Sequence, residues 1–115
     1  MNTLKTRVVN TKKSGIVHFV YVSNDKGAFG ICLDFNIVEE GATEAEVRKH
    51  LEIAVALHIE TVREKNLSDD LLNRLAPQEY WDMYDDFHTK KSAKGKNSLR
   101  VEGMEYTKTA LPMGV

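Results

Sequence analysis

The sequence predicts an α+β fold, in which an antiparallel β-hairpin, extended to a three-stranded sheet, packs on one long helix and is followed by short C-terminal helices. Residues 16–23 are rich in β-branched and aromatic side chains, which favour a strand. A cluster of turn-forming residues at 24–27 separates them from a second strand-like run. Residues 44–65 then place apolar side chains at helical spacing.

The composition is that of one ordinary globular domain. The chain has 115 residues, of which 42% are hydrophobic and 29% charged, with a net charge of -1. This balance excludes a generally basic nucleic-acid binder. The single cysteine, Cys32, excludes an internal disulfide and a cysteine-based zinc site, and we interpret it as a buried structural residue. We predict no metal site and no cofactor.

The N-terminal segment and the apolar runs bear on location. The first 15 residues are polar and lack the apolar segment of a secretory signal. No apolar run approaches the roughly 20 residues that a membrane-spanning helix needs. We therefore expect a cytoplasmic protein without membrane contact.

The second strand is predicted over residues 28–35, where apolar side chains alternate with small or polar ones. The residues of its apolar face are Phe29, Ile31, Leu33 and Phe35. A brief apolar pair, Ile37 and Val38, leads into a third short strand.

Two hairpin registers are compatible with the turn. A four-residue loop pairs Tyr21 with Gly30 and Phe19 with Cys32, which places aromatic rings over small residues. A three-residue loop pairs Tyr21 with Ile31 instead, and a slip of one residue exchanges the two faces of the strand. We favour the first register because of its packing.

The long helix is predicted from Glu44 to Lys65. Thr43 and Glu46 have the spacing of a capping box, in which each side chain bonds to the other residue's backbone amide. The buried stripe is expected to contain Val47, Leu51, Ala54, Val55, His58 and Val62. Residues 53–59 are apolar nearly all round, so this part of the helix should be buried on more than one side. The second covering element would be the next helix or another subunit, and we expect a homodimer or higher oligomer.

Two shorter helices are predicted after the long one. Ser68 can cap a helix over residues 69–76, and a second helix follows over residues 78–88. We assign residues 1–89 to one α+β domain with a helical extension. Residues 90–115 form a basic linker, over 90–98, and a tail, in which weak alternation over 99–111 could add an edge strand.

The second of these helices has an unusual composition, because residues 78–87 combine four aromatic with four acidic side chains and contain no basic residue. One interpretation is an amphipathic helix in which Tyr80, Tyr84 and Phe87 form one stripe flanked by Trp81, and these aromatic side chains pack on the core. The other is an acidic and aromatic surface that binds a basic partner. The candidate partner-binding residues are Tyr80, Trp81, Asp82, Tyr84, Asp85, Asp86 and Phe87.

The sequence supports no catalytic constellation. A metal-dependent nuclease needs several converging carboxylates, and the predicted strands offer only Asp34. His58 lies on the apolar stripe and is interpreted as a core histidine. The basic run at 90–96 lacks the interleaved aromatic residues that bind single strands, so we interpret it as a solvated tail and do not expect DNA binding.

The order of strand, glycine-containing turn, strand, short strand and threonine-capped helix resembles the HicB-like antitoxin family. The match covers about residues 17–63 and rests on Phe29, on the corner 41–43 and on one helix pattern. The helix residues that match are Glu46, Leu51, Ala54, Leu57 and Glu60. The resemblance implies a truncated RNase H-like fold that lacks nuclease carboxylates and neutralises a small HicA-type mRNA-cleaving toxin.

The chain also departs from the family pattern. Glu44 and Arg48 stand where the family tends to have apolar residues, and Ile53 and Ala56 stand where it has polar ones. The apolar helix face is therefore rotated or widened, which favours a different docking surface. Many members of the family also carry a ribbon-helix-helix or helix-turn-helix DNA-binding tail, and residues 67–115 match neither.

These observations predict a non-catalytic protein-binding domain of the HicB-like antitoxin kind. The alternative is a stand-alone homo-oligomeric module of the same fold without a toxin partner. A divergent metal-dependent nuclease is a third reading, and it would depend on Asp34.

Overall fold

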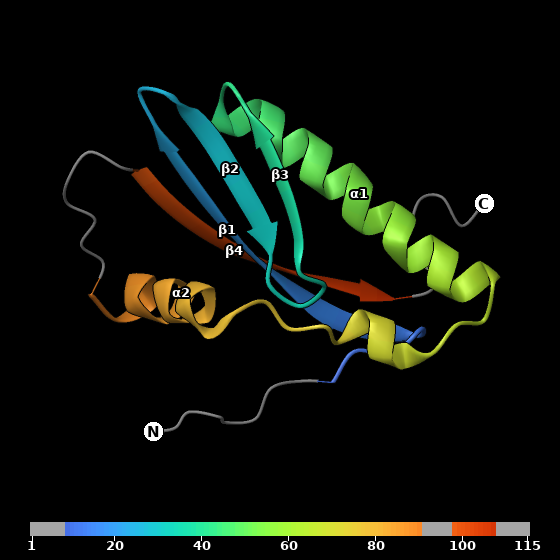
Figure 1. The fold of residues 1–115 in the computed structure, drawn as a ribbon. Helices are drawn as coiled ribbons and strands as arrows, with labels where there is room; N and C mark the ends of the chain where they lie inside the picture. The colour runs from blue at the N-terminus through green and yellow to red at the C-terminus, as the bar shows by residue number, and fades with distance from the viewer. Residues whose placement is uncertain (1–8, 91–97, 108–115) are drawn as a thin grey trace.

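The computed structural model describes residues 9–90 and 98–107. Four antiparallel strands form one sheet in the order β3-β2-β1-β4, with α1 along one face and α2 against the other (Figure 1). The elements are β1 (Ser14–Asn24), β2 (Gly27–Cys32), β3 (Ile37–Gly41), α1 (Glu44–Glu64), the short 3-10 helix η1 (Asp69–Leu72), α2 (Gln78–Lys90) and β4 (Ser98–Thr107). The predicted α+β fold is confirmed, with four strands in the sheet instead of three.

The central strand β1 is buried on both faces. Val17, Phe19 and Tyr21 point toward α1, and all are at most 1% exposed. Val20 and Val22 alternate with them and point toward α2. A strand that is covered on both sides needs apolar residues in both sets of positions, which explains the nearly unbroken apolar run in its sequence.

The favoured hairpin register is confirmed. Tyr21 is opposite Gly30 and Phe19 is opposite Cys32. A Cβ atom at Gly30 would lie 2.7 Å from the Tyr21 ring and 2.9 Å from Val47, so only glycine lets the ring and the helix approach this strand. Gly27 adopts a φ of 146° where the chain leaves the turn, a conformation that favours glycine.

The second strand ends at Cys32, so the prediction that it continues to residue 35 is wrong. Residues 33–36 form a turn instead, in which the Asn36 amide donates to the Cys32 carbonyl (2.8 Å) and Asn36 has a φ of 58°. The turn breaks the strand alternation. Leu33 remains on the α2 side, but Phe35 packs with the α1 cluster.

The α1 helix begins with the predicted cap. The Glu46 amide donates to the Thr43 hydroxyl (3.2 Å), and the Glu46 carboxylate accepts from the Ala42 amide (3.1 Å), one residue earlier than the capping box predicts. Its buried side chains are Val47, Leu51, Val55, Ile59 and Val62.

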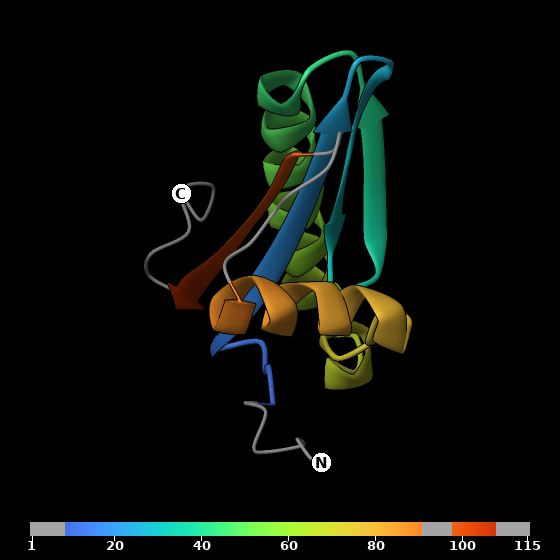
Figure 2. The same cartoon turned by 90° about the vertical axis from the view of Figure 1, so that its left-hand side faces the viewer.

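The outer face of α1 keeps apolar side chains in solvent. Ile53 and Leu57 are 51% and 54% exposed, and they lie one helical turn apart. The next helix does not cover them, because α2 packs on the opposite face of the sheet (Figure 2). Within the described residues, no helix combines the length and apolarity needed to cross a bilayer.

The crossover between the two faces is held by side-chain amides. It contains η1, which ends at Leu72, so the predicted helix over 69–76 is shorter than expected and of the 3-10 type. Asn10, which is 1% exposed, receives a hydrogen bond from Asn73 and donates to the Leu72 carbonyl (2.9 and 3.0 Å). The Ala76 amide then donates to the Leu33 carbonyl (2.8 Å), which brings the chain to the α2 side.

The fourth strand pairs with β1 at the sheet edge, where the sequence had indicated only weak alternation. Ion pairs tie it to α1: Arg48 binds Glu102, and Glu44 accepts from Arg100 (2.7 Å) and from Arg48 (3.2 Å). The predicted basic linker at 90–98 lies largely outside the described residues, as do residues 108–111 of the predicted edge strand.

The two sides of α1 predict different sensitivities to one substitution. Leu51→Ala, at a fully buried position, should lower the free energy of unfolding by about 2–5 kcal/mol, because it leaves a cavity against the sheet. Leu57→Ala is the matched control on the exposed face and should change it by less than about 1 kcal/mol. Urea unfolding of both variants measures the difference, and equal losses would contradict the described orientation of α1.

Candidate functional site

The α2 helix presents two chemically different faces. Trp81 is 6% exposed and belongs to the core cluster between α2 and the sheet, where Tyr80, Met83 and Tyr84 pack around it. The Tyr80 ring meets Phe29 of β2 edge to face, with 6.5 Å between centroids. The exposed residues of the helix include Gln78, Glu79, Asp82, Asp85 and Asp86. The structure therefore separates the aromatic side chains, on the inner face, from the acidic ones, on the outer face.

The separation of the two faces determines which of the predicted partner-binding residues lie on the surface of the domain. Trp81 is the centre of the inner face, whereas the sequence had placed it beside a stripe of Tyr80, Tyr84 and Phe87. A tryptophan in the core cannot also anchor a partner, so the aromatic half of the predicted surface serves to attach α2. Phe87 is half-buried. The acidic half lies on the exposed outer side of the helix, where Asp82 accepts a hydrogen bond from Gln78 (3.0 Å).

A histidine and a carboxylate meet beneath α2. The Asp34 side chain, which is 4% exposed, accepts a hydrogen bond from the His18 backbone amide, and both of its oxygens lie 3.1 Å from Nδ1 of the His18 ring. The His18 ring contacts Trp81 and Tyr84, with centroids 5.5 and 5.2 Å away. Burial raises the pKa of Tyr84, and the Asp34 charge raises it further.

The contacts of the His18–Asp34 pair determine what the two side chains can do. Both Asp34 oxygens lie within hydrogen-bond distance of Nδ1, a geometry in which a carboxylate can accept a proton from the ring and fix the orientation of the imidazole. The Asp34 carboxylate, in turn, is occupied by His18 and nearly closed to solvent. Sequence reasoning missed the pair, because the turn at 33–36 changes the direction of Asp34. The sequence signal that could have indicated the pair is His18, a titratable residue inside the apolar run of β1.

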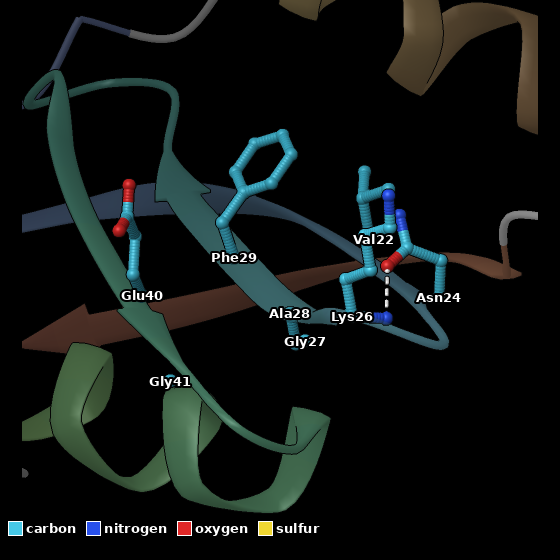
Figure 3. Close-up of a pocket in the computed structure, with 8 residues that line it drawn as sticks. All are labelled: Val22, Asn24, Lys26, Gly27, Ala28, Phe29, Glu40 and Gly41. Carbon is cyan, nitrogen blue, oxygen red and sulfur yellow. Dashed lines mark hydrogen bonds between the residues drawn. The ribbon is translucent and has the colours of Figure 1, made fainter.

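The exposed side of β2 and β3 forms a third feature. Phe29, Glu40 and Val22 point to the same side of the sheet, away from α1 (Figure 3). Between them and the β1–β2 turn is a shallow open hollow of about 550 Å³. The turn is fixed by the Lys26 amide, which donates to the Asn24 side chain (2.8 Å). The hollow is lined by Val22, Asn24, Lys26, Gly27, Ala28, Phe29, Glu40 and Gly41.

The remaining reactive side chains lie in the core or apart from one another. His58 is half-buried at the margin of the core: its ring packs against Phe35 (4.8 Å between centroids) and its Nε2 lies 2.7 Å from the Leu71 carbonyl. Across residues 9–90 and 98–107, no three His, Cys, Asp or Glu side chains are grouped so that they could hold a metal ion.

Comparison of the chain with protein-family models, with curated proteins and with solved structures finds no match.

Cys32 is fully buried on the α1 side of β2. Burial, and then the charge of Asp34, raise the pKa of its thiol from 9.0 to about 12. The thiolate is the reactive form, so the native thiol should react with a disulfide reagent at pH 8 many-fold more slowly than the thiol of the urea-unfolded chain. Equal rates would show that the thiol is exposed.

The same pKa shift predicts a pH dependence of stability. The unfolded chain loses the thiol proton at a lower pH than the native protein does, so this contribution to stability is complete below pH 9 and is lost as the pH rises toward 12. Buried tyrosines titrate in the same direction, and Tyr106 has its pKa raised to about 12 by burial. Comparison with Cys32→Val isolates the cysteine, because the variant should lose less stability over that range. A variant with the same pH profile as the native chain would contradict the assignment.

Proposed function

We propose that this chain is a non-catalytic protein-binding domain that acts as a HicB-like antitoxin and neutralises a small HicA-type mRNA-cleaving toxin. The observation that carries the proposal is the two-faced arrangement of α2, which buries its aromatic side chains and presents Asp82, Asp85 and Asp86 outward. A ribonuclease has to attract RNA phosphates, and positively charged residues do this. An ordered row of carboxylates on a helix is a complementary surface for such an enzyme.

The mechanism that we propose is occlusion of the toxin. The carboxylates on α2 would occupy the basic residues that otherwise contact RNA, while the body of the domain blocks the approach of the substrate. The contacts that hold α2 are separate from those that would bind the partner, because Trp81 and Tyr84 face the sheet. The helix can therefore be a rigid platform, which lowers the entropy lost on binding.

The position of Asp34 supports the non-catalytic part of the proposal. It is the carboxylate on which the alternative, a metal-dependent nuclease, would depend. Both of its oxygens lie 3.1 Å from the His18 ring and the residue is 3% exposed. A carboxylate in this environment attaches the 33–36 turn to β1 and positions the His18 ring that α2 contacts.

A second candidate function is favoured by the outer face of α1. Ile53 and Leu57 form an apolar pair with both side chains more than half exposed. Two copies of α1 packed against each other would cover both pairs. This arrangement corresponds to a stand-alone homo-oligomeric module that does not need a toxin partner.

The antitoxin form predicts a complex with a small basic protein encoded by the adjacent gene. Replacing Asp82, Asp85 and Asp86 together by asparagine should weaken that complex by roughly tenfold or more, because three charges leave the binding surface while side-chain size is kept. Titration calorimetry of the purified pair measures the change. The matched control replaces Glu52, Glu60 and Glu64 of α1 by glutamine. Failure of the two proteins to associate, or an equal loss in the control, would contradict the proposal.

The oligomeric form predicts that the chain is a dimer in solution at protein concentrations of about 10 μM or more. The double variant Ile53→Lys, Leu57→Lys should be a monomer, because it places four charges in the proposed helix–helix contact. Leu75→Lys is the control, since Leu75 is also 51% exposed but lies outside α1. Light scattering after size exclusion distinguishes the two states, and a native chain that elutes as a monomer would remove this candidate.

A further inference from the structure

We propose that the outer edge of β3 binds an extended segment of the partner protein, which joins the sheet as an additional strand and places two adjacent basic residues opposite Glu39 and Glu40. This inference rests on the proposed protein-binding function and names the chemistry of the bound segment. It assigns a binding role to Ile37–Gly41, a strand outside the predicted partner-binding residues.

The first argument is the position of β3 in the sheet. The strand order ends at β3, so its outer edge has no neighbouring strand within the described residues. Its inner edge pairs with β2 over five residues in regular antiparallel register. Backbone donors and acceptors on such an edge can bind an extended peptide, and addition of a strand to an exposed edge is a recurring mode of peptide recognition.

The second argument is charge. Glu39 and Glu40 are consecutive, so their side chains point to opposite faces of the strand. Neither carboxylate forms an ion pair with another described residue. Two acidic residues without a counter-charge, one on each face of an edge strand, are complementary to two consecutive basic residues on an added strand.

The third argument is the apolar surface beside the edge. Val38 is 51% exposed and points to the same side of the sheet as Ile31, its partner on β2. On that side the hollow with Phe29 and Glu40 in its wall lies next to the strand (Figure 3). An apolar side chain opposite Val38 would cover it, and the long stem of a basic residue opposite Glu40 would lie along the hollow.

The register then fixes a short sequence pattern. A segment antiparallel to β3 would run, from its N-terminus, past Gly41, Glu40, Glu39, Val38 and Ile37. The pattern is therefore a small residue, two basic residues and two apolar residues. The peptide Ser-Lys-Arg-Val-Ile-Thr has this pattern and serves as the probe.

Other pairings of sheet edges fit less well. A second copy of this chain, paired symmetrically through the middle of β3, would place Glu39 opposite its own copy, and like charges in that position are unfavourable. The opposite edge of the sheet is formed by β4, which carries charges of both signs. Two of these, Arg100 and Glu102, are already paired with α1. The β3 edge is thus the one whose charge selects a basic partner.

The test is fluorescence anisotropy of the labelled, end-blocked peptide with the full chain. We expect saturable binding with a dissociation constant below about 1 mM. The double variant Glu39→Lys, Glu40→Lys should weaken it roughly tenfold or more, because both cross-strand attractions become repulsions. The matched control Glu52→Lys, Glu64→Lys has the same change in net charge on exposed positions of α1 and should change it less than about twofold. A peptide methylated on alternate backbone nitrogens, which cannot complete the strand pairing, should not bind, and hydrogen exchange in residues 37–41 should slow only with the unmodified peptide.

The outcomes separate this inference from the proposed function. Equal binding of the methylated peptide, equal weakening by the α1 control, or no binding of the unmodified peptide would overturn strand addition at β3. The affinity for the neighbouring basic protein is a further test. If Glu39→Lys, Glu40→Lys leaves that affinity unchanged, strand addition at β3 is overturned, but the proposed antitoxin function is not. Specific peptide binding without any such complex would support the edge and overturn the antitoxin assignment.

Discussion

The fold depends on the burial of β1 from both sides. This strand supplies Phe19 and Tyr21 to the layer under α1, and Val20 and Val22 to the layer under α2. Neither helix alone can cover it, since alternate residues of a strand point in opposite directions. The chain therefore has to cross from one face of the sheet to the other after α1, and the segment between the two helices makes that crossing. What is left for function lies outside these layers: the outer faces of the two helices and the edges of the sheet.

The two helices reach this arrangement by different means. The long helix approaches the sheet closely because Gly30 has no side chain between the Tyr21 ring and Val47. Ion pairs between Arg48 and Glu102, and between Arg100 and Glu44, then attach β4 to its first turns. The shorter helix is held by aromatic contacts, and Trp81 and Tyr84 enclose the ring of His18. Asp34 holds that ring from the turn after β2, so the His18–Asp34 pair links the turn to β1 through the carboxylate and to α2 through the imidazole ring.

Local patterns predicted much of the fold. The register at Tyr21 and Gly30 followed from the preference of aromatic rings for small partners, and the start of α1 followed from the spacing of Thr43 and Glu46. Both depend on neighbours in sequence. The end of β2 did not follow, because alternation continues through Phe35 in the sequence while the left-handed backbone of Asn36 turns the chain. The fourth strand was only weakly indicated, and there are two reasons. Its partner strand lies about 80 residues earlier in the chain. Its positions that face α1 include Arg100 and Glu102, which form ion pairs with α1 and do not give the strand an apolar pattern.

The candidate site was predicted in composition but not in geometry. Residues 78–87 were recognised as acidic and aromatic, and the structure shows that these two properties belong to opposite faces of α2. Helical periodicity indicated Tyr80 and Tyr84 as the inner stripe, but the position of the helix over β1 and β4 makes Trp81 its centre. The pairing of His18 with Asp34 and the exposure of Val38 at the end of the sheet are consequences of tertiary structure. No pattern within a short window of sequence contains them.

Docking of α2 on the face opposite α1 is the central claim, because the outward row of carboxylates and the closed environment of Asp34 both depend on it. The chain contains one tryptophan, Trp81, so its fluorescence reports this contact without interference from a second tryptophan. The most direct measurement is acrylamide quenching of that fluorescence in the native chain and in urea. We expect weak quenching in the native chain that rises strongly on unfolding, since the side chain is 6% exposed. Native quenching as strong as that of the unfolded chain would show that α2 is not docked and would contradict this description of the fold and its surfaces.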